Sequence, residues 1–241
     1  MNAIYTWGLA RALGGTVILR IEDHDRTRSR PAFETALVEE LDWLGFVADA
    51  GRDPLLRQSD ESPAYEAALA TLREHAHVYA CSCSRKEIGG DMYPGTCRAR
   101  GLAEHSGVGL RVQMTGAHGD VLVRDRDGHW TYQFAVTSDD FRQGVTLVIR
   151  GSDLESSTDR QIELARMLGR AEPPVFLHHP LLLKPSGEKL SKSSGDTGVR
   201  ELRDAGVTPA DVIGLAAAAA SLIDVPYAIP ASDVHTLFSR S

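Results

Sequence analysis

The densest group of potential metal ligands in the sequence consists of Cys81, Cys83 and Cys97. They lie in a stretch, 78–116, where helical and strand periodicity fails and glycine, proline and arginine accumulate. Zinc prefers thiolates in a tetrahedron of four ligands, and a bound zinc can take the place of a missing hydrophobic core. The three cysteines therefore predict one structural zinc site, with unpaired buried thiols as the simpler alternative.

Chemistry alone leaves the fourth zinc ligand open. Four nearby side chains carry a suitable donor atom: Tyr93, His75, His77 and His105. Histidine is the default expectation, because imidazole is the usual companion of thiolates in zinc sites. No pattern around the cysteines marks one sulfur as a catalytic nucleophile.

A second group of reactive side chains lies in the run KLSKS, which is flanked by glycines and contains Lys189, Ser191, Lys192 and Ser193. Two ammonium groups and several hydroxyls on a glycine-hinged loop can wrap the triphosphate of ATP. They can also offset the negative charge that builds up as pyrophosphate leaves. Taken alone, the same composition also fits a solvated loop.

A third group places opposite charges at the ends of two predicted strands. Glu22 and Asp23 follow an apolar strand at 16–21, and Arg150 ends another at 146–150. Ligands of open parallel sheets bind beyond the carboxyl ends of the strands. A carboxylate there can hold an ammonium group, while an arginine clamps a carboxylate with two hydrogen bonds, so together they would bind an amino acid. The simpler alternative is that the acids cap a turn and that Arg150 pairs with one of them.

The elements that must position these groups alternate along the chain. Hydrophobic periodicity and glycine stops predict helices over 2–13, 31–44, from 62 onward, 159–168 and 209–223. Strands are expected over 16–21, 121–124, 130–136, 146–150 and 176–183, with a hairpin turn at Asp127-Gly128. This alternation favours an α/β fold, a Rossmann-like doubly wound parallel sheet with a zinc-containing insert and a short C-terminal helical part.

The same pattern predicts four segments. They are a first half of the catalytic domain over 1–76, the insert over 77–118, a second half over 119–190, and the KLSKS loop with C-terminal helices over 191–241. The chain begins with a helix that feeds directly into a strand, which is the second half of a strand-helix-strand unit. A leading strand is therefore expected to be missing from the sheet.

Composition excludes several classes of protein. The 241 residues carry 42% hydrophobic and 24% charged residues, values typical of globular proteins, and the longest apolar run is too short to cross a bilayer. Neither a membrane protein nor a secreted one is expected, so a cytoplasmic monomer is predicted. The net charge of −7 argues against RNA contact over the whole surface, although basic residues gather at 26–30 and 98–100.

Three separated blocks, in order, resemble the catalytic domain of the class I glutamyl-tRNA synthetases. They are GGTVILRIEDHDRTRSRPAFETALVEELDWLGF, VIRGSDLESSTDRQIELARMLG and KLSKS. The resemblance covers roughly residues 2–215. It implies that Glu22, Tyr132 and Arg150 contact glutamate and that Lys192 contacts ATP, which is used with Mg²⁺.

Two features resemble the short branch of that family, the glutamyl-Q tRNA(Asp) synthetases, which have no anticodon-binding domain. One is CSC followed by YPGTCR, which matches the branch's zinc pattern and implies Tyr93 as the fourth ligand. The other is the short stretch after KLSKS. The resemblance implies two steps, formation of glutamyl-adenylate and transfer of the glutamyl group to queuosine in the anticodon of tRNA(Asp).

One departure from the family lies at the beginning of the chain. The family opens with a strand, a proline- and serine-rich loop and a histidine-glycine-histidine signature, none of which precedes the first helix here. Because those groups face the ATP phosphates, we expect the printed chain alone to have little activity. Two alternatives are a fragment of an ordinary glutamyl-tRNA synthetase and an inactive RNA-binding relative.

Overall fold

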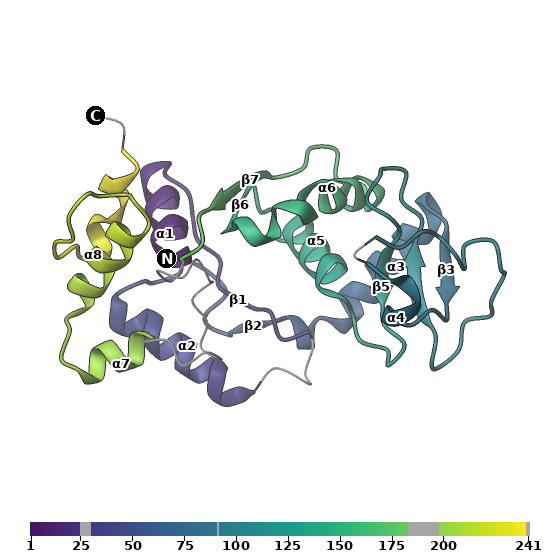
Figure 1. Ribbon diagram of the computed structural model, residues 1–241, viewed down its shortest axis with the longest axis horizontal. Coiled ribbons are helices and arrows are strands. Elements are labelled where there is room, and N and C mark those ends of the chain that lie inside the picture. Colours follow the sequence, from purple (N-terminus) through teal and green to yellow (C-terminus); the bar gives the residue numbers. More distant parts are fainter. Residues whose placement is uncertain (25–29, 91, 183–197, 240–241) are drawn as a thin grey trace.

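The computed structural model describes residues 1–24, 30–90, 92–182 and 198–239 of an elongated molecule. The C-terminal helices pack beside the first helix at one end, and the cysteine-containing segment forms the other end (Figure 1). Two parallel strand pairs and their helices lie between these ends. No helix in the described ranges has the length and apolar character needed to span a bilayer.

The first parallel pair follows the predicted order of helix, strand, helix. Its elements are α1 (Asn2–Ala12), β1 (Arg20–Ile21), α2 (Pro31–Leu44), β2 (Leu56–Arg57), η1 (Gln58–Asp60) and α3 (Ser62–His75). The α2 helix begins at a proline and ends before Gly45, whose φ of 86° is favourable only for glycine. The strand expected over 16–21 is shorter than predicted, because residue 18 forms only an isolated bridge with Ala50.

The second parallel pair supports the other half of the molecule. It consists of β6 (Leu147–Gly151) and β7 (Val175–His179), covered by α5 (Tyr132–Arg142) and α6 (Thr158–Met167), with η2 (Ser152–Ser157) between strand and helix. The α/β class is confirmed, but the prediction of one doubly wound sheet is wrong for the described residues. The β1–β2 and β6–β7 pairs are separate sheets because a groove, rather than a hydrogen-bond ladder, lies between β1 and β6.

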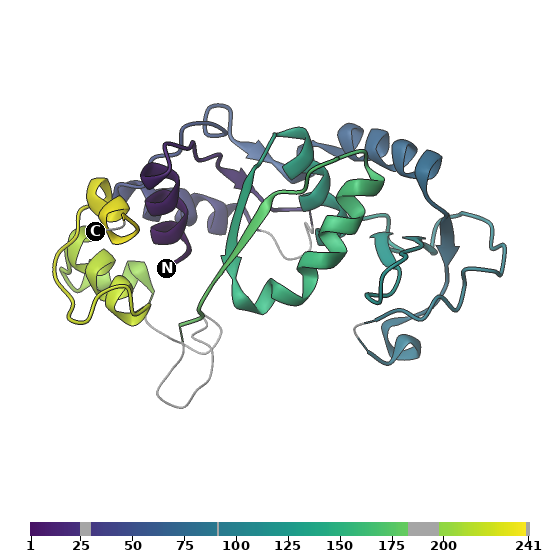
Figure 2. The same cartoon turned by 90° about the horizontal axis from the view of Figure 1, so that it is seen from above.

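The segment from β3 to β5 (residues 78–124), here called the cysteine insert, has its own sheet. Strands β3 (Val78–Cys81), β4 (Gly109–Val112) and β5 (Val121–Arg124) pair antiparallel in this order, and α4 (Arg85–Ile88) follows β3. Seen from above, this sheet stands at the end opposite both termini (Figure 2). The insert is more regular than the sequence predicts, and its sheet extends past residue 118; the four predicted segment boundaries stay predictions.

The expected strand over 130–136 is wrong, since α5 begins at Tyr132. The Asp127-Gly128 turn does form, yet the hairpin ends in a single bridge between Arg124 and Trp130. Aromatic and β-branched residues favour a strand locally, but they are buried here on a helix, where Phe134 packs on Trp130 at 5.4 Å between ring centroids. Tertiary packing therefore overrides the local preference.

The C-terminal part packs on the first helix. Three elements follow β7 in the chain: helices α7 (Val199–Asp204) and α8 (Pro209–Ala219) and the 3₁₀ segment η4 (Ala231–Leu237). Residues of α1, α8 and η4 share one apolar cluster with Phe46, and that cluster is distinct from the one between α3, α5, α6 and the insert sheet. The described residues thus form two large hydrophobic cores, with a third, smaller cluster around Tyr93 in the insert.

A buried carboxylate on α5 links the two halves. Asp139 is fully buried and accepts hydrogen bonds from Gln58 (2.9 Å), the Tyr65 hydroxyl (2.8 Å) and Arg142 (3.0 Å). Its carboxylate also lies 3.7 Å from the guanidinium of Arg20 on β1. One side chain therefore connects α5 with β1, η1 and α3.

We expect Asp139→Ala to lower the free energy of unfolding by about 3–5 kcal/mol, because it leaves buried partners without an acceptor and a buried cation without its counter-charge. Denaturant unfolding followed by circular dichroism measures the change. The exposed Asp224→Ala is the matched control, with an expected change below about 0.5 kcal/mol. Equal stabilities for the two variants would contradict a structural role for Asp139.

Candidate active site

The groove between β1 and β6, here called the β1–β6 groove, has a volume of about 430 Å³. Residues of α1, of the β1 region, of α5 and of β6 line it. The lining contains all three side chains predicted to contact an amino acid: Glu22, Tyr132 and Arg150. Residues separated by more than a hundred positions are thus brought together at the carboxyl ends of two strands.

Arg150 is held rigidly at the end of β6. Only 6% of the residue is exposed, and its guanidinium donates to Gln161 (2.6 Å), Thr158 (2.8 Å) and the ring of His178 (3.2 Å). These bonds use three of its five N–H groups and leave one on each terminal nitrogen for a ligand among the described contacts. Arg150 pairs with neither Glu22 nor Asp23 in the described structure, so the simpler alternative does not account for it.

Glu22 and Asp23 have different surroundings. Asp23 is buried and accepts a hydrogen bond at 2.9 Å from the backbone N–H of Ser59 in η1, 36 positions along the chain. The Glu22 side chain is 40% exposed and lies 3.2 Å from the guanidinium of Arg20. Glu22 therefore keeps a carboxylate face open to the groove.

Arg20 connects Glu22 to α5. It donates to the carboxylate of Asp140 at 3.0 Å and to the amide oxygen of Gln143 at 2.9 Å. Burial raises the pKa of Asp140 above its usual range, against the opposing effect of the Arg20 guanidinium. Arg20 and Asp140 thus connect Glu22 to α5.

Tyr132 stands between the two charged ends of the groove. Burial, followed by the Glu22 carboxylate, raises the pKa of its hydroxyl to about 12, although the Arg150 guanidinium acts in the opposite direction. The phenol is therefore neutral at physiological pH, and it can both donate and accept a hydrogen bond. Its ring centroid lies 6.0 Å from that of His24, which is bonded to Gln58.

Sequence patterns missed several groups that hold this site. Gln161 bridges Arg150 to Gln133 at the start of α5 (2.8 Å), and Thr158 contacts both Arg150 and His178. The ring of His178 accepts a hydrogen bond from Nε of Arg150 at 3.2 Å. Gln161 and Thr158 lie in a quoted family block, but no property of an isolated Gln or Thr marks such a role.

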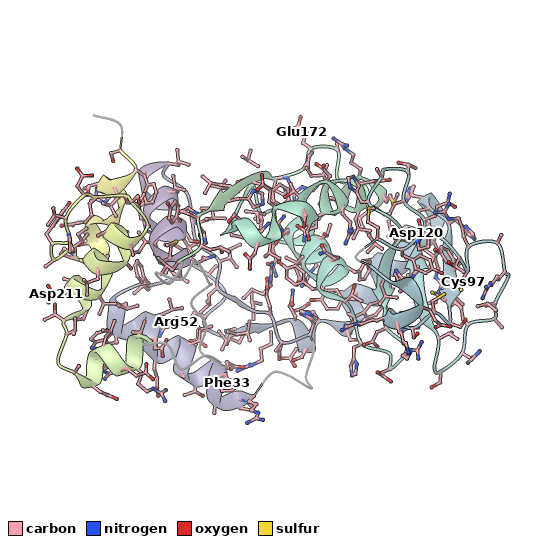
Figure 3. All side chains as sticks on the ribbon, viewed as in Figure 1. Phe33, Arg52, Cys97, Asp120, Glu172 and Asp211 are labelled. Carbon is pink, nitrogen blue, oxygen red and sulfur yellow. The ribbon has the colours of Figure 1, made fainter. Side chains whose placement is uncertain are left out.

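The three cysteines lie together at the far end of the molecule, where Cys97 is marked beside Asp120 (Figure 3). They are free thiols whose sulfur atoms all lie within 4.8 Å of one another. The hydroxyl of Tyr93 lies 3.3 Å from the sulfur of Cys81 and 3.5 Å from that of Cys83. No histidine of the described residues belongs to this group, so the default expectation of a histidine is not met.

The surroundings shift the pKa values of two of the thiols in opposite directions. The Tyr93 hydroxyl lowers the pKa of Cys83, but burial and the neighbouring thiols outweigh it and raise that pKa. Burial raises the pKa of Cys97, but hydrogen bonds from Tyr93 and the backbone of Ser82 outweigh it and lower that pKa to about 6. The guanidinium of Arg111 donates to Cys81 at 3.3 Å and lies 3.9 Å from the centre of the Tyr93 ring. A positive charge thus faces the cysteine and tyrosine side chains.

The other predicted site residues, Lys189, Ser191, Lys192 and Ser193, lie outside the described residues. Their assignment to ATP stays a prediction from the sequence.

Comparisons with known proteins agree with this arrangement. The family described as tRNA synthetases class I (E and Q), catalytic domain, matches residues 1–92 and 104–216. A glutamyl-Q tRNA(Asp) synthetase of Symbiobacterium thermophilum is 37% identical over 98% of this chain and 86% of its own length. The protein of the same name from Nitratidesulfovibrio vulgaris is 38% identical over 90% and 80%, respectively.

Solved structures support the fold. A glutamate tRNA ligase of Elizabethkingia meningosepticum, crystallised with its amino acid, matches 100% of this chain with a TM-score of 0.78 and 23% identity. The chain spans 61% of the length of that structure. Together with the sequence relatives, these matches establish that the chain belongs to the class I tRNA synthetase (E and Q) catalytic-domain family, as an aminoacyl-tRNA synthetase-like ligase of the glutamyl-Q tRNA(Asp) synthetase branch.

Proposed function

We propose that this protein activates glutamate with ATP and transfers the glutamyl group to queuosine in the anticodon of tRNA(Asp). The observation that carries the proposal is the convergence of Glu22, Tyr132 and Arg150 in the β1–β6 groove. The choice of acceptor is supported by the names of its relatives. Two glutamyl-Q tRNA(Asp) synthetases align with most of this chain.

The charges of the groove suit one orientation of glutamate. Its ammonium group pairs with the carboxylate of Glu22, which is half-exposed. Its side-chain carboxylate accepts hydrogen bonds from the two remaining N–H groups of Arg150, and the hydroxyl of Tyr132 donates to that carboxylate or accepts from the ammonium group. The α-carboxylate must stay free, because it is the nucleophile of the first step. Glutamine would leave the Arg150 clamp without a counter-charge.

In the first step an oxygen of the α-carboxylate attacks the α-phosphorus of ATP. The bond from that phosphorus to the bridging oxygen breaks, so pyrophosphate leaves with the electron pair and glutamyl-adenylate forms. Mg²⁺ bound to ATP offsets part of the phosphate charge. We assign Lys189, Ser191, Lys192 and Ser193 to the phosphates, with Lys192 as the catalytic cation, on their sequence signature.

In the second step a hydroxyl of the queuosine ring attacks the carbonyl carbon of the adenylate. The hydroxyl loses its proton as the new ester bond forms, and AMP leaves with the electrons of the broken C–O bond. No residue of the described groove is assigned as the base for this proton.

The acceptor is tested with purified tRNA and radiolabelled glutamate. We expect tRNA(Asp) that carries queuosine to be glutamylated, whereas tRNA(Asp) without queuosine and tRNA(Glu) are not. Glutamylation of tRNA(Glu) at its 3′ end would indicate an ordinary glutamyl-tRNA synthetase, and no glutamate-dependent pyrophosphate exchange would indicate a non-catalytic relative.

The glutamate site is tested by Arg150→Lys and Glu22→Gln. Arg150→Lys removes the two-bond clamp, so the KM for glutamate in pyrophosphate exchange should rise about 10- to 100-fold. Glu22→Gln should also raise the KM for glutamate, because the ammonium group of glutamate loses its counter-charge. Glu66→Gln is the matched control, since Glu66 pairs with Arg124 on the surface outside the groove.

Thermal melting of each variant separates binding from folding, because Arg150 is also a buried structural contact. An unchanged glutamate KM in a folded Arg150→Lys protein would remove Arg150 from the site.

We also propose that Cys81, Cys83, Tyr93 and Cys97 hold one structural zinc ion. Two sulfur ligands each about 2.3 Å from a tetrahedral zinc lie about 3.8 Å apart. The sulfur atoms of Cys83 and Cys97 are 3.5 Å apart, and the tyrosine hydroxyl lies at a similar distance from two sulfurs, so the donor set fits the ion. Arg111, which faces Cys81, offsets the surplus negative charge of three thiolates.

Chelation tests the metal. We expect about one zinc per chain by elemental analysis, and its removal should lower the melting temperature because the insert has few other apolar contacts at this point. Tyr93→Phe should weaken zinc binding more than about 100-fold, since loss of an outer-shell partner alone costs about 10- to 100-fold. Tyr79→Phe, which removes a hydroxyl bonded to Asp120 in the same cluster, should bind zinc normally. Equal zinc affinities in the two variants would exclude Tyr93 as a ligand.

A further inference from the structure

A second cavity, of about 620 Å³, lies between the cysteine insert and the beginnings of α5 and α6. Tyr132 lines both this cavity and the β1–β6 groove. The two cavities are therefore adjacent, with Tyr132 in the lining of each. The volume lies within the range of sites for small ligands, so a single nucleotide can enter it.

The cavity lining is cationic although the chain has a net charge of −7. Arg85, Arg111 and Arg160 line it, against one carboxylate, that of Asp120. The Asp120 side chain is fully buried and accepts two hydrogen bonds from Arg98, at 3.0 and 2.7 Å. Its charge is therefore already matched, and the three lining arginines dominate the cavity.

Two of these arginines are available to a ligand. Arg160 donates from one terminal nitrogen to the backbone oxygen of His118 at 2.9 Å, while its buried Nε has no partner among the described residues. Arg85 is exposed and forms no ion pair with a described residue. Arg111 is engaged by Cys81 and by the backbone of Asp120.

Eight other described arginines are instead held by a carboxylate. They are Arg11, Arg20, Arg52, Arg57, Arg73, Arg98, Arg124 and Arg142. Two guanidinium groups without carboxylate partners in one cavity suit an anion with several oxygens, and a phosphodiester is such an anion.

We propose that Arg85 and Arg160 bind the RNA backbone beside the nucleotide that is glutamylated. One phosphodiester lies in the cavity, and the neighbouring nucleotide passes Tyr132 into the β1–β6 groove. This inference rests on the proposed function, because it takes tRNA as the glutamyl acceptor. The acceptor strand must be single-stranded here, since only unpaired nucleotides can be splayed into separate cavities.

The test uses Arg85→Gln, Arg160→Gln and the double variant. We expect the KM for queuosine-containing tRNA(Asp) to rise about 10-fold for each single change, because each removes a charge-assisted contact. The slope of log affinity against log salt should fall by about 0.7 for each lost phosphate contact. Arg160→Lys should recover most of the affinity, since an ammonium group also binds phosphate.

Lys86→Gln and Arg166→Gln are matched controls, because these exposed cations lie on α4 and α6 but outside the cavity lining. They should keep the wild-type KM and salt slope. Because Arg85 is exposed, Arg85→Gln also tests the cavity if Arg160→Gln fails to fold.

A double variant with the wild-type tRNA KM and salt slope would overturn the inference. It would also be overturned if the variants raised only the KM for ATP in pyrophosphate exchange, because the cavity would then hold nucleotide triphosphate. Direct binding of the same tRNA, followed by fluorescence anisotropy, gives the salt slope without turnover. Failure of the proposed function is a separate result, in which wild-type protein binds the tRNA but does not glutamylate it.

Discussion

The ion-pair cluster around Arg20 is the interaction on which the candidate site depends. Its guanidinium is mostly buried and lies within 4 Å of carboxylates on Glu22, Asp139 and Asp140. Removing these charges from water is costly, so the cluster is stable only when all its members are in place together. Because Arg20 belongs to β1 and two of the acids belong to α5, this condition sets the distance between the two halves of the molecule.

A fixed distance between the halves is what the groove chemistry requires. Glu22 follows β1 and Arg150 lies on β6, and these strands belong to sheets that share no hydrogen bonds among the described residues, so sheet pairing cannot hold the two side chains in register. Side chains perform this task instead: Arg20 anchors the Glu22 end to α5, and Gln161 ties Arg150 to Gln133 at the beginning of the same helix. The α5 helix therefore holds both ends of the groove in position.

Local features of the sequence predicted much of this arrangement. Proline and glycine marked both ends of α2, and the cysteine spacing located the sulfur cluster. The buried network was not predictable, because Asp139 bonds to residues 74 and 81 positions away and no local pattern encodes such pairs. The helix that carries Tyr132 was missed for a related reason: its strand-like composition reflects burial against Tyr65 and Trp130, which only the folded chain brings together.

The position of Tyr132 also couples the cysteine insert to the groove. The β5 strand ends at residue 124, and α5 begins only eight residues later. The hydroxyl of Thr131 donates to the backbone oxygen of Leu122, and Trp130 packs on Phe134 in the first turn of α5. These contacts make the insert sheet and the start of α5 one rigid unit. A metal bound at the cysteines would therefore also help to fix Tyr132, which lies between the groove and the arginine-lined cavity.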